Sequence, residues 1–268
     1  MGTVWLIASG KGGVGKSTLA SSLSVALNER SKSVCLVDMD FGLRGQDNLF
    51  GVQDRIIFDL LDVCEGTCEL DAALIRPYAS RGLCLLSAPQ FARSKDLDGK
   101  AYRDLIARLA ARFDHVIIDC PAGMEQGLRL SMKATVQETV VVVTPDDLCL
   151  RDAQQIISLM EKKHLPRPRL IVNRLFPDLV ESGEMHSAKV CAQFLDVQLL
   201  GEMPDDSNVY RAQLSHLTVL DIDCPAAAAI RRIAGRMLQE DVPFPDFGKK
   251  RSWLSRFFRP GLAEMKRV

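Results

Sequence analysis

The chain has 268 residues, of which 47% are hydrophobic and 25% are charged, and its 34 basic residues balance 34 acidic ones. This composition is typical of a folded protein with a sizeable core, and it excludes both a charge-rich disordered chain and a uniformly basic protein. We therefore expect no specific nucleic acid among the partners. The apolar runs are shorter than the roughly 18 residues of a membrane span, so contact with a membrane must be local.

Seven short apolar runs predict buried strands. They lie at residues 4–8, 33–38, 83–87, 115–119, 139–144, 169–173 and 199–203. Segments with helical periodicity follow them, at residues 16–30, 100–112, 126–136, 151–163, 186–195, 208–214 and 225–240. Most of the runs are continuous rather than alternating, as expected of strands buried on both faces of a parallel sheet. The sequence therefore predicts an α/β fold, a mostly parallel twisted sheet with helices on both faces.

Eight cysteines are scattered along the chain without a C-x-x-C pair, and several fall inside the predicted strands. The N-terminus has neither a basic segment nor a long apolar one, so we expect no secretory signal. A disulfide framework is typical of short secreted chains. The pattern therefore predicts reduced core thiols in a cytoplasmic protein.

The stretch SGKGGVGKST, residues 9–18, joins the first predicted strand to the first predicted helix. It satisfies the phosphate-loop (Walker A) pattern G-x-x-x-x-G-K-[ST], which predicts a P-loop NTPase fold with ATP and Mg²⁺ as cofactors. In such a loop the backbone N–H groups surround phosphates, Lys16 reaches the β- and γ-phosphates, and Ser17 offers its hydroxyl to Mg²⁺. The nucleotide-binding residues predicted here are Gly10, Lys11, Gly12, Gly13, Val14, Gly15, Lys16, Ser17 and Thr18.

Acidic residues follow two of the predicted strands, at the sheet edge where α/β proteins bind ligands. Asp38 and Asp40 come after the second strand, and Asp119 ends the run HVIID. The apolar run ending in Asp119 is typical of a Walker B motif, in which the carboxylate holds Mg²⁺ through water. Gly123 lies shortly after it, where its N–H can sense the γ-phosphate. For Asp38 and Asp40 the alternative is a structural cap on the next turn.

The octapeptide KGGVGKST, residues 11–18, resembles the deviant Walker A motif of the MinD/ParA family of ATPases. The resemblance implies that Lys11 reaches across a dimer interface to the partner's nucleotide, which couples ATP binding to dimerisation and hydrolysis. It also implies that Asp40 positions the attacking water, with Asp38, among the nucleotide-site residues, supporting Asp40 or the Mg²⁺ shell. The catalytic residues are then Lys11, Lys16 and Asp40. The alternative for Lys11 is a solvated loop charge.

Asn173 ends the sixth predicted strand, and its amide offers a donor and an acceptor in one plane, which matches the edge of adenine. The resemblance implies that an asparagine at this place contacts the base. It also implies a second base-contacting loop at Pro204 and Asp205. The alternative for the following pair, Asp206-Ser207, is the start of a helix.

The pattern changes near Pro243, which predicts an ATPase domain over residues 1–243 and a tail over 244–268. On a helix over about 249–259, four apolar side chains fall within one arc of about 140°, surrounded by basic residues. These side chains are Trp253, Leu254, Phe257 and Phe258. This arrangement predicts an amphipathic helix that binds an anionic membrane surface, more firmly when a dimer presents two tails. The alternative is a helix that docks on the protein itself.

The resemblance to MinD-type members of the family extends from the first strand to the tail, and it departs at Gly45-Gln46, where those members commonly carry Asn-Leu. It implies a spatial regulator of bacterial cell division at the inner face of the membrane, with a MinC-like septum inhibitor and a MinE-like or topological regulator as partners. Three alternatives remain: a ParA-like ATPase that positions DNA or another cargo, an iron–sulfur electron-transfer protein, and a non-hydrolysing adaptor. The iron–sulfur alternative needs a cluster cysteine in the region that follows the Walker B run. It is disfavoured because no cysteine lies between Pro121 and Val143.

Overall fold

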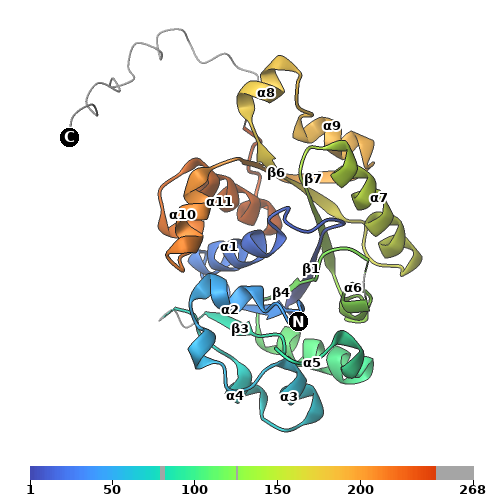
Figure 1. Ribbon diagram of the computed structural model, residues 1–268, viewed down its shortest axis with the longest axis vertical. Helices are drawn as coiled ribbons and strands as arrows, with labels where there is room; N and C mark the ends of the chain where they lie inside the picture. Colours follow the sequence, from blue (N-terminus) through green and yellow to red (C-terminus); the bar gives the residue numbers. More distant parts are fainter. Residues whose placement is uncertain (79–81, 125, 246–268) are drawn as a thin grey trace, which may run out of the picture.

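The computed structural model describes residues 1–78, 82–124 and 126–245. Its centre is a seven-stranded sheet in the order β3-β2-β4-β1-β5-β6-β7, in which every strand pair is parallel (Figure 1). The strands are β1 (Thr3–Ala8), β2 (Val34–Asp38), β3 (Leu83–Leu86), β4 (His115–Asp119), β5 (Glu138–Val143), β6 (Arg169–Leu175) and β7 (Gln198–Pro204). All seven predicted strands are confirmed.

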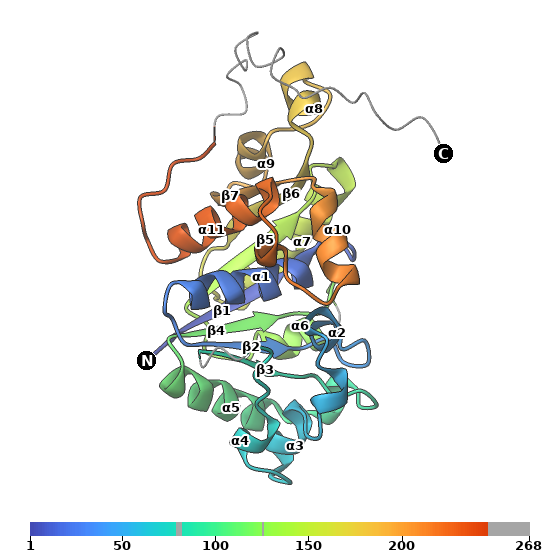
Figure 2. The ribbon, with the colours of Figure 1, turned by 90° about the vertical axis from the view of Figure 1, so that its left-hand side faces the viewer.

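Helices cover both faces of this sheet (Figures 1 and 2). On one face, α1 (Lys16–Glu29) packs against α11 (Pro225–Met237); α5 (Gly99–Arg112), α7 (Asp147–Lys162) and α9 (Ala188–Phe194) lie on the other. The remaining helices are α2 (Gly45–Phe50), α3 (Leu60–Glu65), α4 (Leu70–Ala73), α6 (Gln126–Ser131), α8 (Pro177–Ser182) and α10 (Ser207–Leu214), and the 3₁₀ turns are η1 (Gln53–Arg55), η2 (Ser94–Asp96) and η3 (Val219–Asp221). The predicted layer arrangement is therefore confirmed.

Burial explains why the central strands are continuously apolar. All five residues of β4 are buried, as are five of the six in both β1 and β5, because helices cover these strands on both faces. Even the polar residue at the start of β4 is paired, since the Trp5 indole N–H donates to Nδ1 of His115 at 3.2 Å. A strand buried on both faces cannot alternate polar and apolar side chains.

The predicted helices are present, with shifted ends. The segment predicted at 151–163 begins earlier, at Asp147, because Asp146 accepts the backbone N–H of Cys149 and caps the helix. The segment predicted at 126–136 ends at Ser131. Helices α2, α3, α4 and α8 are absent from the prediction, since four to six residues carry too little periodicity to detect.

The predicted tail helix at 249–259, with Trp253, Leu254, Phe257 and Phe258, lies outside the described residues and stays a prediction, as does the domain boundary at residue 243. The described chain ends at Pro245. Just before this point, the Arg236 guanidinium donates to the carbonyl oxygens of Val242 and Pro243, at 3.0 and 2.9 Å, and lies over the ring of Phe244. Across the described ranges, no helix combines the length and apolarity that a membrane crossing requires.

All eight cysteines lie among the described residues, and all are free thiols. Six are buried and the other two, Cys64 and Cys68, are half-buried. Burial raises the pKa of Cys64 and Cys120 to about 12 in each case, so these thiols stay protonated at neutral pH. The prediction of reduced core thiols agrees with this structure.

Glu202 on β7 is a buried acid that should make stability depend on pH. Burial raises its pKa from 4.5 to about 7, against the lowering effect of Arg236, Arg232 and Lys189. Between these values the folded protein keeps a proton that the unfolded chain has lost, so the free energy of unfolding falls as pH rises from about 5 to about 7. Glu202→Gln removes this titration, and we expect its stability relative to wild type to increase over the same window.

Urea unfolding at pH 5, 6, 7 and 8, followed by circular dichroism, measures this difference. Glu161→Gln, at an exposed position near the end of α7, is the matched control and should run parallel to wild type. Equal pH slopes for wild type and Glu202→Gln would contradict the prediction.

Candidate nucleotide-binding site

The glycine loop lies at the carboxyl edge of the sheet, between the end of β1 and the start of α1. Gly15 has φ of 91°, and a Cβ there would lie 2.4 Å from Nδ2 of Asn173. A Cβ at Gly10 would lie 2.5 Å from the backbone carbonyl carbon of Asp152. Side chains at these two positions would collide with β6 and α7, so the loop exposes backbone rather than side chains. Such a loop before a helix N-terminus fits a chain of phosphates.

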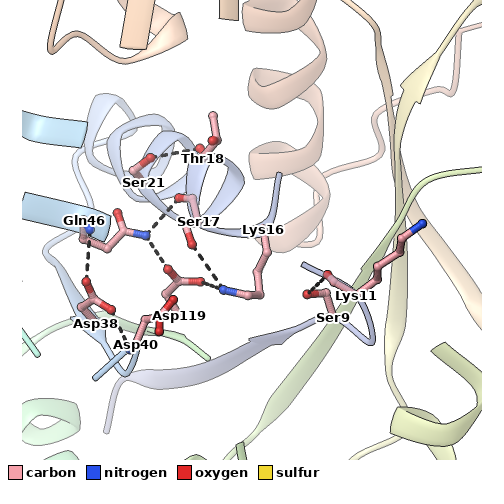
Figure 3. Close-up of polar contacts among 10 residues, drawn as sticks. All are labelled: Ser9, Lys11, Lys16, Ser17, Thr18, Ser21, Asp38, Asp40, Gln46 and Asp119. Carbon is pink, nitrogen blue, oxygen red and sulfur yellow. Dashed lines mark hydrogen bonds and ion pairs between the residues drawn. The ribbon is translucent and has the colours of Figure 1, made fainter. Parts of the chain in front are cut away.

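Lys16 and Asp119 form a buried ion pair at the base of this loop (Figure 3). Nζ of Lys16 lies 2.6 Å from Oδ1 of Asp119, and the two side chains are only 6% and 1% exposed. Burial alone would lower the pKa of Lys16, but the Asp119 carboxylate outweighs it and the pKa is raised. The same ammonium lies 3.3 Å from the hydroxyl of Ser17. The structure thus brings together the three residues predicted to bind phosphate and metal.

Asp38 is fully buried beside this pair and shapes the turn that follows β2. One carboxylate oxygen accepts the backbone N–H of Asp40 at 2.8 Å, and the other accepts that of Gln46 at 3.1 Å. Burial, reinforced by the charge of Asp119, raises the pKa of Asp38 to about 7. The alternative considered for Asp38, a cap on the next turn, therefore describes its contacts here. Those contacts place Asp40 at the same edge of the sheet.

Gln46 was not predicted as a site residue, although the sequence marked Gly45-Gln46 as a departure from the family. Its side chain is fully buried. The amide nitrogen Nε2 donates to Oδ2 of Asp119 at 2.6 Å and to the backbone oxygen of Ser17 at 3.0 Å (Figure 3). Gln46 therefore joins α2 to both the Walker B aspartate and the phosphate-loop helix.

Lys11 stands apart from this cluster, and Figure 3 shows its side chain extending away from Lys16. Its Nζ lies 3.8 Å from Asp146, and the two side chains are 43% and 48% exposed. Hydrogen bonds from Thr144 and Cys149, together with the Lys11 charge, outweigh burial and lower the pKa of Asp146. Asp146 follows a predicted strand, so the strand-end rule that found Asp119 could have identified it too.

Gly123 connects the segment after β4 to the start of the glycine loop. Its backbone N–H donates to the carbonyl oxygen of Ser9 at 3.0 Å, and its φ of 78° is in the left-handed region. The hydroxyl of Ser9 in turn donates to the carbonyl oxygen of Lys11 at 3.1 Å. The N–H predicted to sense the γ-phosphate therefore donates to the start of the loop in this structure, and its role toward phosphate stays a prediction.

A cavity of about 250 Å³ adjoins the loop, and the residues predicted to contact the base line it. Asn173, Pro204 and Asp205 come from the ends of β6 and β7, and they face Gly15 and Thr18. The Asn173 amide donates to the carbonyl oxygen of Val14 at 2.7 Å, which fixes its side chain against the loop. Gln213, on α10, was not predicted; it lines the cavity, and its amide donates to the Thr18 hydroxyl at 2.7 Å.

The donors at this site suit a nucleotide with Mg²⁺. The hydroxyl of Ser17 and the carboxylate of Asp119 are hard oxygen ligands of the kind that Mg²⁺ takes, directly or through water. The glycine cradle and the neighbouring cavity provide separate places for phosphates and a base. A parallel sheet with a Walker A loop, a Walker B aspartate and this cavity defines a P-loop NTPase.

Comparison with known proteins identifies the family within this class. A family model described as "ParA: NUBPL iron-transfer P-loop NTPase" matches residues 1–238. The septum site-determining protein MinD of Helicobacter pylori is 37% identical over 262 residues, which cover 95% of this chain and 97% of that protein. MinD of Bacillus subtilis is 39% identical over 247 residues, 91% of each chain.

Solved structures of MinD proteins also resemble this chain. The MinC:MinD cell division complex of Aquifex aeolicus contains a chain with a TM-score of 0.84 and 30% identity, covering 92% of this chain and 100% of that one. MinD of Pyrococcus horikoshii, complexed with Mg-ADP, has a TM-score of 0.78 and 26% identity over 88% and 96% of the chains. The chain belongs to the MinD group of the MinD/ParA family, and it is an ATPase.

The buried ion pair predicts strong coupling between Lys16 and Asp119 in the absence of nucleotide. Lys16→Met leaves a buried carboxylate without its cation, and we expect the free energy of unfolding to fall by about 3–5 kcal/mol. Asp119→Asn in the same chain removes the unpaired charge and should recover much of that loss. The double variant is then clearly more stable than the sum of the two single effects predicts.

Urea unfolding of the wild type, both single variants and the double variant, in buffer with EDTA, gives the four free energies needed. Strictly additive effects would show that the two groups do not stabilise each other.

Proposed function

We propose that this protein is an ATP-driven spatial regulator of bacterial cell division that dimerises with ATP and binds the inner face of the membrane. The similarity to MinD proteins over nearly the whole chain supports the role in division. The observation that carries the coupling to dimerisation is the position of Lys11. This second lysine lies at the mouth of the glycine loop, half exposed and away from Lys16.

Within one subunit, the chain's own residues divide the work of binding. ATP supplies the bond that is hydrolysed, and Mg²⁺ neutralises charge on its phosphates. Lys16, which faces Asp119 here, is placed to turn toward phosphates in the glycine cradle. Asp119 is then free to hold Mg²⁺ together with the hydroxyl of Ser17. Asn173, with Pro204 and Asp205, orients the base in the adjoining cavity.

Between two subunits, Lys11 carries its charge to the partner's phosphates. Its pairing with Asp146 is half exposed, and such pairs contribute only about 0–1 kcal/mol, so the lysine can leave at little cost. A cation added from outside stabilises developing phosphate charge, as arginine fingers do in other P-loop enzymes. Asp40 positions the attacking water. Because the Lys11 charge comes from the partner, hydrolysis follows dimer formation and then separates the subunits.

The dimer is the form that stays on the membrane. A single amphipathic tail over about 249–259 binds an anionic surface weakly, whereas two tails held together gain avidity. On the membrane, the dimer recruits a MinC-like septum inhibitor; this step rests on the MinC:MinD complex among the similar structures. A MinE-like or topological regulator sets where the dimers accumulate.

Lys11→Ala should separate nucleotide binding from dimerisation. We expect the variant to bind ATP with an affinity within a few-fold of wild type, because Lys16 and the glycine cradle are intact. It should stay monomeric with ATP and lose most ATPase activity. Light scattering after size-exclusion chromatography and a phosphate-release assay measure the two properties. Lys162→Ala, at the exposed end of α7, is the matched control. ATP-dependent dimers of Lys11→Ala would contradict the proposal.

The tail is tested by sedimentation with vesicles of phosphatidylglycerol and phosphatidylethanolamine. Wild type should pellet with a non-hydrolysable ATP analogue and far less with ADP, and a chain truncated after Phe247 should not pellet with either. Purified MinC from the same organism should pellet only with the wild-type, ATP-bound form. Equal pelleting with ATP analogue and ADP would refute the nucleotide control, and full pelleting of the truncated chain would refute the tail.

A further inference from the structure

The side chain of Gln46, on α2, contacts both the phosphate-loop helix and the Walker B aspartate. Its amide nitrogen donates to Oδ2 of Asp119 at 2.6 Å and to the backbone oxygen of Ser17 at 3.0 Å. The backbone N–H of Gln46 donates to Asp38 at 3.1 Å. The residue therefore contacts three chain segments that surround the phosphate end of the site.

The contacts fix which way the amide of Gln46 faces. If its nitrogen and oxygen were exchanged, the amide oxygen would lie 2.6 Å from a carboxylate oxygen and 3.0 Å from a carbonyl oxygen, which repel it. In the orientation found, both amide hydrogens have acceptors, whereas the amide oxygen is buried without a partner among the described residues. Leaving a buried acceptor unpaired is unfavourable. A buried arrangement that tolerates this cost points to a role beyond packing.

We propose that Gln46 is a positioning residue for magnesium binding, acting through Asp119. The inference rests on the proposed use of a nucleotide with Mg²⁺. The two oxygens of Asp119 have different partners: Lys16 contacts Oδ1, and Gln46 contacts Oδ2. When phosphates take Lys16, Oδ1 becomes available to the ion while Gln46 still holds Oδ2. The carboxylate then stays in one orientation instead of rotating freely.

The position of Gln46 also links the metal site to the outer part of α2. Arg44 and Asp47, which flank the residue, form their own ion pair at 2.7 Å, and Arg44 has the unusual φ of 47°. The turn is thus held on both sides of Gln46, so its side chain enters the site from a fixed backbone. A donor on a fixed backbone can orient a carboxylate, whereas one on a loose loop cannot.

The test is the effect of Mg²⁺ on the affinity for ADP, measured by titration with a fluorescent ADP in Mg²⁺ and in EDTA. Gln46→Met keeps the shape of the side chain and removes the amide. We expect the ratio of the ADP dissociation constant in EDTA to that in Mg²⁺ to fall by about tenfold, as for other residues that orient a metal ligand. The dissociation constant in EDTA should stay within twofold of wild type. Gln53→Met, at an exposed position in the adjacent turn η1, is the matched control and should change neither value.

Two further measurements separate positioning from a general structural role. In an Asp119→Asn background, Gln46→Met should have no further effect on the ratio, because its action passes through Asp119. The second measurement is the ADP dissociation constant of Gln46→Met in EDTA; a lower melting temperature is expected in either case, because the variant leaves Oδ2 of Asp119 and the carbonyl oxygen of Ser17 without this donor.

An unchanged ratio in Gln46→Met would overturn the inference and leave the proposed function intact. An ADP dissociation constant in EDTA that rises more than twofold in Gln46→Met would also overturn it, because the effect would then be structural. If the ADP affinity of the wild-type protein does not depend on Mg²⁺, both this inference and the proposed magnesium site are overturned.

Discussion

The ion pair between Lys16 and Asp119 joins the two parts of the sequence on which the whole site depends. The glycine loop follows β1 and Asp119 ends β4, and these neighbouring parallel strands pair with Ile7 opposite Asp119. A shift of one residue in this register would turn the carboxylate to the other face of the sheet. Because both charges are buried, each would be strongly unfavourable alone. Correct pairing of β1 with β4 therefore places both members of the ion pair.

The two lysines of the loop differ in how deeply they are buried, and this difference suits them to different roles in the proposed function. Lys16 is buried and can leave Asp119 only if other charges replace both partners, which a nucleotide with a divalent cation provides. Lys11 is half exposed, and its contact with Asp146 at 3.8 Å is weak and readily screened. In the proposed function, the buried lysine responds to the subunit's own nucleotide, and the exposed lysine is available to the partner's.

The sequence predicted those features that leave a local signal. The strands and long helices follow from apolar runs and periodicity, and the loop and Asp119 follow from motifs in the correct strand context. Asn173 came from its place at a strand end together with the family resemblance. Pro204 and Asp205 came from the resemblance alone, because nothing in their spacing relates them to Gly15. Helices α2, α3, α4 and α8 are too short to show a period. Gln46 attracted notice only as a departure, since its contact with Asp119 joins residues 73 positions apart.

The buried site holds more acidic groups than basic ones, so the ionised forms of its acids are stabilised by a bound cation. Asp38 and Asp119 are both buried and face one buried ammonium, that of Lys16. Burial and the neighbouring carboxylate together raise the pKa of Asp38 to about 7, so the cluster resists a second full negative charge at neutral pH. A divalent cation near these groups favours their ionised forms, whereas phosphates alone add to the repulsion. In the proposed function, these electrostatics favour nucleotide with Mg²⁺ over nucleotide alone, and Asp119, which contacts both Lys16 and Gln46, is the residue through which the preference acts.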